Sequence, residues 1–497
     1  MNSTQDSLKK ITKGAGIIFV GMIISKLLGY VYRILIARVG TETYGLFSIG
    51  IALFSLLTTI SLVGLNRGVL RYISFYRAKE DLGKVKELIS FSLKITSLFS
   101  LIVSIIFFVF SDKIAILFFH NSDLSIIFKI LAVFIPFSVF REVIFSIIES
   151  FQKIKYEIYS KNIVENVIKI LLTLIFLTLG FKLIGFTVAY AIGILISTLT
   201  ALFFLKKLIS IKLNLNPSKI LKKELFFYSF PLSFSLLISS IINWTDTLML
   251  GFFRTASEIG IYNAALSTAF LMYIIPSILL GLFIPILTEV YAKDDKDSFN
   301  QIHKRVTKWI LFTNIALLSL FYLFSKPILR ILFGLDYVSG STVLIILSTG
   351  YFIGYSLSAS TRVLMIINKT KLIFINTLAI TIINIILNLY LIPIYGISGA
   401  AIATASAFMI RSILLLIESI IILKVVPFNI KHLGILFSAL ISFLLIKILL
   451  PTEISLINLV LFSLLFLVVY VISLILTRSL EKEDLSLLGL MDGFKKS

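Results

Sequence analysis

Long apolar runs, separated by short polar segments, follow one another along nearly the whole chain. A hydrocarbon core of about 30 Å requires roughly 20 apolar residues in a helix, and the runs have that length. Transmembrane β-strands are shorter and alternate strictly between apolar and polar residues, which these runs do not. The pattern predicts fourteen transmembrane helices, at residues 14–37, 46–66, 87–110, 124–150, 161–181, 183–205, 225–251, 262–290, 309–325, 340–368, 372–393, 397–423, 432–450 and 455–477.

Composition agrees with an all-α membrane protein. Of the 497 residues, 58% are hydrophobic and 14% are charged, and the mean hydropathy is +1.05. Soluble domains have about a quarter of their residues charged. The absence of cysteine excludes disulfides, a thiolate nucleophile and an iron–sulfur cluster. The three histidines are far apart in the sequence, so we expect neither a zinc site nor another cofactor.

Positive charge is distributed unevenly between alternate loops. Of the 46 lysine and arginine residues, 31 fall in the termini and in every second loop, and 6 fall in the opposite loops. The positive-inside rule therefore predicts that both termini face the cytoplasm, and it explains the net charge of +21 without nucleic acid. The first apolar run follows a basic N-terminus and lacks an A-x-A cleavage site, so we interpret it as a retained helix.

The chain contains an internal repeat. A gap-free shift of 215 residues places YGLFSIG (44–50) over IGIYNAA (259–265) and Tyr76 over Tyr291, and a looser match places residues 151–160 over 367–376. Six helices per copy give parallel repeats, which is a transporter architecture. We therefore expect a first lobe at residues 1–213, a second lobe at 214–424 that begins with a polar linker at 214–227, and two further helices with a tail at 425–497.

Two cations lie inside the first predicted helix. Lys26 and Arg33 are seven positions apart and share one helix face, with Gly29 between them. A cation at bilayer depth costs at least ~2.5–3.5 kcal/mol and usually faces a cavity or a partner. For Arg33, snorkelling to the interface is an equal alternative. Lys26 lies nearer the centre of the helix, which favours a cavity.

Other charged residues fall within predicted helices. Glu165 and Lys169 are four apart, as in an intrahelical pair, and Arg411 and Glu418 are seven apart on one face. For these sets, a structural ion pair and a ligand site are equally supported by the sequence. The candidates for substrate binding are Lys26, Arg33, Arg141, Lys169, Arg362 and Arg411, and those for ion coupling are Glu165, Asp246 and Glu418.

Cations outnumber carboxylates in the helices of the first lobe. A water-filled cavity with excess positive charge suits an anionic substrate, and Arg and Lys bind phosphate by charge-assisted hydrogen bonds. The sequence has no G-x-x-x-x-G-K-[ST] loop, so ATP is not expected as the direct fuel. The segment KDDKD (293–297) is interpreted as a solvated loop and not as a metal-binding acidic pair.

Several segments resemble a known family. SKLLGYVYR (25–33), YGLFSIGIALFSLLTTISLVGLNRGVLRYIS (44–74), ASEIGIYNAALSTAF (256–270) and PILTEV (285–290) resemble the polysaccharide-biosynthesis flippases of the multidrug/oligosaccharidyl-lipid/polysaccharide exporter superfamily. The resemblance covers nearly the whole chain. It implies two six-helix lobes in a V-shaped exporter fold plus two C-terminal helices.

The resemblance also implies a function. These flippases move isoprenoid-pyrophosphate-linked sugars across the cell membrane by alternating access, and they are not enzymes. SKLLG is similar to the S-R-x-x-G stretch of the related lipid II flippases, whose first-helix cations face the cavity and are needed for transport. Lys26 then replaces their first arginine, and Arg33 lies within one position of their second. The implied partners are an isoprenoid-linked glycan, membrane lipids and glycan-polymerising or glycosyl-transfer machinery, without nucleic acid.

Three alternatives remain at this point. A Na⁺- or H⁺-coupled drug or metabolite exporter of the same superfamily would use Asp246, Glu165 or Glu418, and the cation-rich first lobe argues against it. A membrane-embedded glycosyl transferase or polymerase would need a large loop with acidic catalytic residues, but no loop exceeds about twenty residues. The third alternative is a non-transporting scaffold that has kept the fold.

Overall fold

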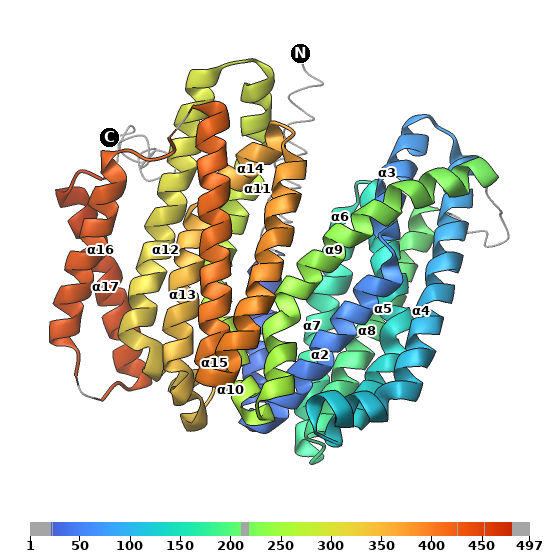
Figure 1. Ribbon diagram of the computed structural model, residues 1–497, viewed down its shortest axis with the longest axis horizontal. Coiled ribbons are helices and arrows are strands. Elements are labelled where there is room, and N and C mark those ends of the chain that lie inside the picture. The colour runs from blue at the N-terminus through green and yellow to red at the C-terminus, as the bar shows by residue number, and fades with distance from the viewer. Residues whose placement is uncertain (1–20, 22, 210–217, 425, 452, 480–497) are drawn as a thin grey trace. The chain divides into compact units, whose positions relative to one another are not determined.

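The computed structural model describes residues 21, 23–209, 218–424, 426–451 and 453–479, and this part of the chain is helical without β-strands. The chain divides into two compact units, Met1–Asn263 and Ala264–Ser497. Eleven helices of the described part are long and apolar enough to cross a membrane, which makes this a multi-pass membrane protein. Figure 1 shows the helices of the two units.

The first unit begins with a helix whose described residues are 23–37. Among the later helices, α5 is the central one, since it packs against α2, α3, α4 and α8. Their bounds are α2 Thr41–Leu62, α3 Leu65–Ala78, α4 Leu82–Phe119, α5 Asp123–Ser150, α6 Ile154–Glu157, the π-helix η1 Ile158–Val164, α7 Glu165–Thr178, α8 Leu183–Leu208, α9 Lys219–Phe253 and α10 Ala256–Ala269, which continues into the second unit.

The second unit contains the remaining helices. Within it α12 packs against α13, α16 and α17, and α13 packs against α15. A core cluster around Phe324, Phe466 and Tyr470 joins α12 to the last two helices. The bounds are the 3₁₀ turn η2 Phe270–Tyr273, α11 Ile274–Ala292, α12 Lys296–Leu332, the 3₁₀ turn η3 Leu335–Gly340, α13 Ser341–Ser356, α14 Ser358–Ile366, α15 Thr370–Leu423, α16 Ile430–Leu449 and α17 Leu456–Leu476.

Each of the fourteen predicted segments contains helix within the described residues. The segments 124–150, 432–450 and 455–477 match α5, α16 and α17 within two residues at each end. Two expected loops are wrong in part, because α3 extends through the basic residues 67–78 and α9 begins inside the expected linker. The length of an apolar run indicates only the part of a helix that lies in hydrocarbon. The charged turns of α3 and α9 extend beyond that part, so the apolar runs did not predict them. Fourteen membrane crossings remain a prediction.

Helix α15 consists of two antiparallel limbs. Gly396 interrupts it with φ 57° and ψ −134°, and Pro393 lies just before. Asn384 of the first limb donates to the hydroxyl of Thr404 in the second at 3.1 Å. The break lies between the predicted helices 372–393 and 397–423, so the prediction of two helices here is confirmed.

The turn after α3 has the same backbone conformation as the turn after α11, and the turn after α5 has the same conformation as the turn after α14. Glu80 and Asp294 have φ of 59° and 54°, and Gln152 and Asn368 have φ of 59° and 61°. The backbone hydrogen bonds around each pair are also the same. These pairs lie 214 and 216 positions apart, so the gap-free shift of 215 is wrong by one residue at the first loop. The two copies of the repeat differ just before this loop, because the helix of the first copy is interrupted at Gly64, whereas that of the second copy contains the 3₁₀ turn η2.

Candidate functional site

The face of the first helix that carries Lys26 and Arg33 is open. Lys26 is exposed and Arg33 is partly exposed, and the two cations interact electrostatically. A Cβ atom added to Gly29 would meet no atom within 4 Å. The helix therefore presents two positive groups on either side of a glycine whose Cβ position is open. That this space receives a substrate stays a prediction.

The other two cations predicted for the first unit are buried and paired. Arg141 on α5 and Lys169 on α7 both contact the carboxylate of Glu165, with Lys169 Nζ at 2.5 Å from Oε1, and all three side chains are at most 8% exposed. Lys169 also lies 3.8 Å from the ring centroid of Tyr190. One carboxylate thus balances one of the two positive charges that it contacts, and the geometry supports an ion-pair role.

A second carboxylate extends this network toward the π-helix. Glu142 accepts from Arg141 Nη2 at 3.2 Å and from Lys161 Nζ at 2.8 Å. Lys161 belongs to η1, and Glu165 follows directly after it. π-Helical turns are rare and occur frequently at functional sites. Here the turn determines which side chains of α7 face α5. The pairing of Glu165 with Lys169 was predictable from spacing, whereas the pairing of Glu165 with Arg141 and that of Glu142 with Lys161 were not.

Asp246 on α9 is buried beside a neutral donor. The hydroxyl of Tyr262 on α10 donates to its carboxylate, and Asp246 and Tyr262 are 5% and 0% exposed. One position further along each helix, the hydroxyl of Thr247 donates to Asn263 Oδ1 at 3.3 Å. A buried carboxyl group with a phenol partner is chemically able to bind and release a proton.

In the second unit, Arg411 and Glu418 do not pair with each other. Arg411 Nε donates to the hydroxyl of Thr377 at 3.3 Å, and Glu418 accepts from Asn376 Nδ2 at 2.7 and 2.8 Å. Both partners lie on the other limb of α15. Arg362 on α14 donates to the sulfur of Met365, at 3.6 Å. Arg411 and Glu418 were expected to share one helix face, but they form no ion pair with each other, because each has a closer partner on the first limb of α15.

Sequence reasoning missed a cluster of aromatic side chains, one of which, Tyr355, interacts electrostatically with Arg411. Tyr355 lies 5.3 Å from Tyr273, 5.4 Å from Tyr351 and 5.0 Å from Phe408 between ring centroids. The repeat of tyrosine at positions 351 and 355, four apart with glycine before each, was the available signal.

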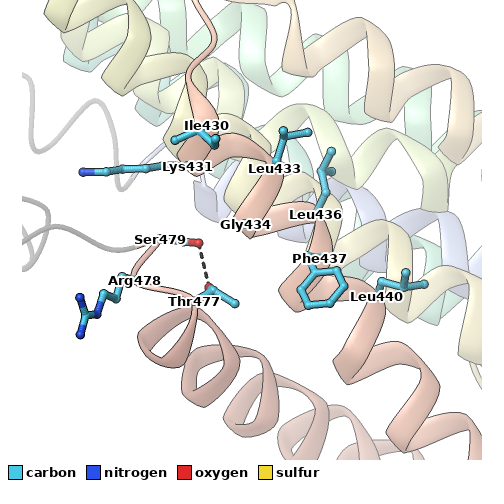
Figure 2. A pocket seen from close by; sticks show the side chains of 10 residues that line it. All are labelled: Ile430, Lys431, Leu433, Gly434, Leu436, Phe437, Leu440, Thr477, Arg478 and Ser479. Carbon is cyan, nitrogen blue, oxygen red and sulfur yellow. Dashed lines mark hydrogen bonds between the residues drawn. The ribbon is translucent and has the colours of Figure 1, made fainter.

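Two hollows lie within single units. The larger, of about 770 Å³, lies between α16 and the end of α17 (Figure 2). Leu433, Leu436, Phe437 and Leu440 form its apolar side, and Lys431 and Arg478 lie at its other end. Apolar side chains beside cations suit a lipid chain with an anionic headgroup. The smaller hollow, of about 490 Å³, is more polar and lies where α2, α5 and α10 begin.

Comparisons with known proteins identify the family. The family described as "Polysaccharide biosynthesis protein" matches residues 11–291, and the MatE family matches residues 231–390. The chain is 25% identical over 384 residues to a putative O-antigen transporter of Shigella flexneri, covering 76% of this chain and 89% of that protein. It is 29% identical over 182 residues to the probable low-salt glycan biosynthesis flippase Agl15 of Haloferax volcanii, covering 35% of this chain and 36% of that protein.

Among solved structures, the fold is similar to that of the lipid II flippase MurJ in an inward closed conformation. The TM-score is 0.76 at 22% identity, with 92% of this chain and 98% of that chain covered. At this identity the likeness concerns the fold alone. The family match, in contrast, covers more than half of the sequence. The chain belongs to the polysaccharide biosynthesis protein family of the multidrug/oligosaccharidyl-lipid/polysaccharide exporter superfamily.

Proposed function

We propose that the protein is a flippase that moves lipid-(pyro)phosphate-linked oligosaccharides from the cytoplasmic to the outer leaflet of the cell membrane. Its product would be used in the synthesis of a polysaccharide or cell-envelope glycan. Family membership and the relatives named as O-antigen transporter and glycan flippase support this function. We further propose two six-helix lobes that alternate in access, with both chain termini in the cytoplasm, and partners among glycan-polymerising or glycosyl-transfer proteins.

The observation that carries the proposal is the open, positive face of the first helix. In our proposal Lys26 and Arg33 bind the (pyro)phosphate, and the space at Gly29 admits its oxygens close to the helix. A hydrogen bond between a charged donor and phosphate contributes about 1.5–3 kcal/mol. The hydrocarbon chain of the substrate remains in the bilayer, so the protein has to shield only the polar part.

The test is flipping of a fluorescent lipid-pyrophosphate oligosaccharide in proteoliposomes. Lys26→Ala and Arg33→Ala should each slow flipping at least tenfold, since one lost charged hydrogen bond corresponds to about ten- to hundredfold weaker binding. Lys113→Ala, which removes an exposed cation of the same unit, is the matched control. Thermal unfolding of each variant shows that it is folded. Unchanged flipping in the double variant would reject the proposed phosphate site.

A second candidate function is a Na⁺- or H⁺-coupled exporter of drugs or metabolites. The match of the MatE family to residues 231–390 is the observation that favours it. The same proteoliposomes distinguish the two functions. Expulsion of cationic dyes under an imposed ion gradient, without flipping of the lipid-linked sugar, would replace the flippase proposal.

A further inference from the structure

The arginine pair of the second unit, Arg362 and Arg411, has no carboxylate partner among the described residues. The ion pairs of this part of the chain all involve other cations. The hydrogen bonds of the pair go to the Met365 sulfur at 3.6 Å and to the Thr377 hydroxyl at 3.3 Å. Both contacts are long and uncharged, so they stabilise the two guanidinium groups only weakly.

The two arginines also repel one another. Arg411 interacts electrostatically with Arg362, and both side chains are partly buried within helices of a membrane protein. A single cation at bilayer depth already costs at least ~2.5–3.5 kcal/mol. In the first unit, Glu142 and Glu165 compensate such charges. Among the described residues of the second unit, no carboxylate forms an ion pair with Arg362 or Arg411, so an added anion would stabilise the pair.

An aromatic cluster adjoins Arg411, because Phe408 lies three positions before it on the same helix, α15. We define this cluster as Tyr273, Tyr351, Tyr355 and Phe408. Its rings lie 5.0–5.4 Å apart between centroids, and Arg411 interacts electrostatically with the Tyr355 hydroxyl. Tyr273 and Phe408 are partly exposed, whereas Tyr351 and Tyr355 are 7% exposed. The cluster thus offers ring faces and phenol hydroxyls, with the guanidinium group of Arg411 close to Tyr355.

Close helix packing holds the aromatic cluster in place. A Cβ atom on Gly354 of α13 would overlap the ring of Phe408, and one on Gly350 would lie 2.5 Å from the Cα atom of Ala405. Small residues four apart allow helices in membranes to approach closely. The glycines therefore allow Phe408 of α15 to lie directly across α13, against both tyrosines.

Sugars present C–H faces that pack on aromatic rings and hydroxyls that bond to phenols, and Arg binds carboxylate or phosphate bidentately. We propose that the arginine pair and the aromatic cluster form a subsite for an acidic sugar of the glycan cargo. This inference rests on the proposed flippase function and specifies its substrate class. The shared chemistry is an oxyanion beside a sugar ring. We assign it to a sugar carboxylate, because the proposed function already places the lipid-borne pyrophosphate at Lys26 and Arg33.

Binding to the full chain in lipid nanodiscs tests the proposal by calorimetry. The probes are a tetrasaccharide of alternating glucuronate and N-acetylglucosamine, the uncharged N-acetylglucosamine tetrasaccharide, and inorganic pyrophosphate. We expect the acidic tetrasaccharide to bind at least tenfold more tightly than the uncharged one. Arg362→Gln, Arg411→Gln and Phe408→Ala should each weaken its binding about tenfold. Arg330→Gln, which removes an exposed cation of the same unit, should have no effect.

Each contrary result overturns a defined part of the proposal. Equal binding of the charged and uncharged probes, or no binding of the acidic probe, rejects the acidic-sugar subsite. Displacement of the acidic probe by pyrophosphate, with Phe408→Ala unaffected, assigns the arginine pair to the lipid carrier. Arg362→Gln should also raise the melting temperature of the ligand-free protein, since it removes a repulsion. Binding requires no flipping, so these results are independent of the proteoliposome test.

Discussion

Gly45 of α2 and Gly260 of α10 lie back to back within the first unit, each against the backbone of the other helix. A Cβ atom on Gly45 would overlap the carbonyl oxygen of Ala256, and one on Gly260 would overlap that of Thr41. Thr41 and Ala256 are themselves 215 positions apart, as are the two glycines. The contact is therefore reciprocal, as in an isologous pair, and agrees with the repeat register predicted for this segment.

The first prediction concerns this crossing. Gly45→Ala should lower the free energy of unfolding by about 1–3 kcal/mol or more, because the added methyl group meets backbone and not a flexible side chain. Thermal unfolding in detergent measures the change. Gly281→Ala is the matched control, since a Cβ atom there meets nothing within 4 Å and alanine favours the helix by about 0.5–1 kcal/mol. Equal melting temperatures for the two variants would contradict the close contact.

A second prediction concerns the buried carboxylate of Glu165. Glu165→Gln removes the charge that compensates Arg141 and Lys169. Loss of one partner from a buried ion pair destabilises a protein by about 3–5 kcal/mol, so the melting temperature should fall markedly. Glu289→Gln removes one partner of an exposed pair with Lys293 and should leave it unchanged. A stable Glu165→Gln variant with slow flipping would instead assign the network to transport.

A third prediction concerns pH and the start of α12. The backbone N–H of Ser298 donates to Asp295 at 3.0 Å, and this bond lowers the pKa of the carboxyl group. A lowered pKa in the folded state stabilises the helix start above the unfolded value of about 3.9 and loses that effect as the pH falls. Amide hydrogen exchange, corrected for its intrinsic pH dependence, should show the first turn opening below that pH.

Asp295→Asn provides the control for this measurement. Asparagine is also a good N-cap residue but does not titrate, so protection of the first turn should become independent of pH. The same loss of protection in both proteins would show that another group controls the helix start.

A fourth prediction concerns ion coupling. Among the three candidates, Glu165 is held by two cations and Glu418 by an amide, whereas Asp246 accepts from the phenol of Tyr262. We therefore expect Asp246→Asn to make flipping insensitive to an imposed H⁺ or Na⁺ gradient. Tyr262→Phe should weaken the response without removing it. A normal gradient response in Asp246→Asn would exclude this residue from coupling.

The helices could be predicted well from the sequence because the thickness of the hydrocarbon core sets the number of consecutive apolar residues in each spanning helix. The sequence predicted the pairing of Glu165 with Lys169 because both lie on one helix. It did not predict that Arg141 joins them, because this is a tertiary contact between side chains of two different helices, α5 and α7. The aromatic cluster was missed for the same reason, since Phe408 reaches the tyrosines only through packing at Gly354.

The π-helix η1 has a consequence for the evolution of this protein. A π-helical turn is equivalent to a single-residue insertion in an α-helix, and it rotates all following side chains by about 100° around the axis. Glu165 and Lys169 come after this insertion, and their direction toward α5 depends on it. Homologues that lack the additional residue would have to be aligned with a gap between residues 158 and 164. An ungapped alignment would otherwise equate Glu165 with a residue that faces elsewhere.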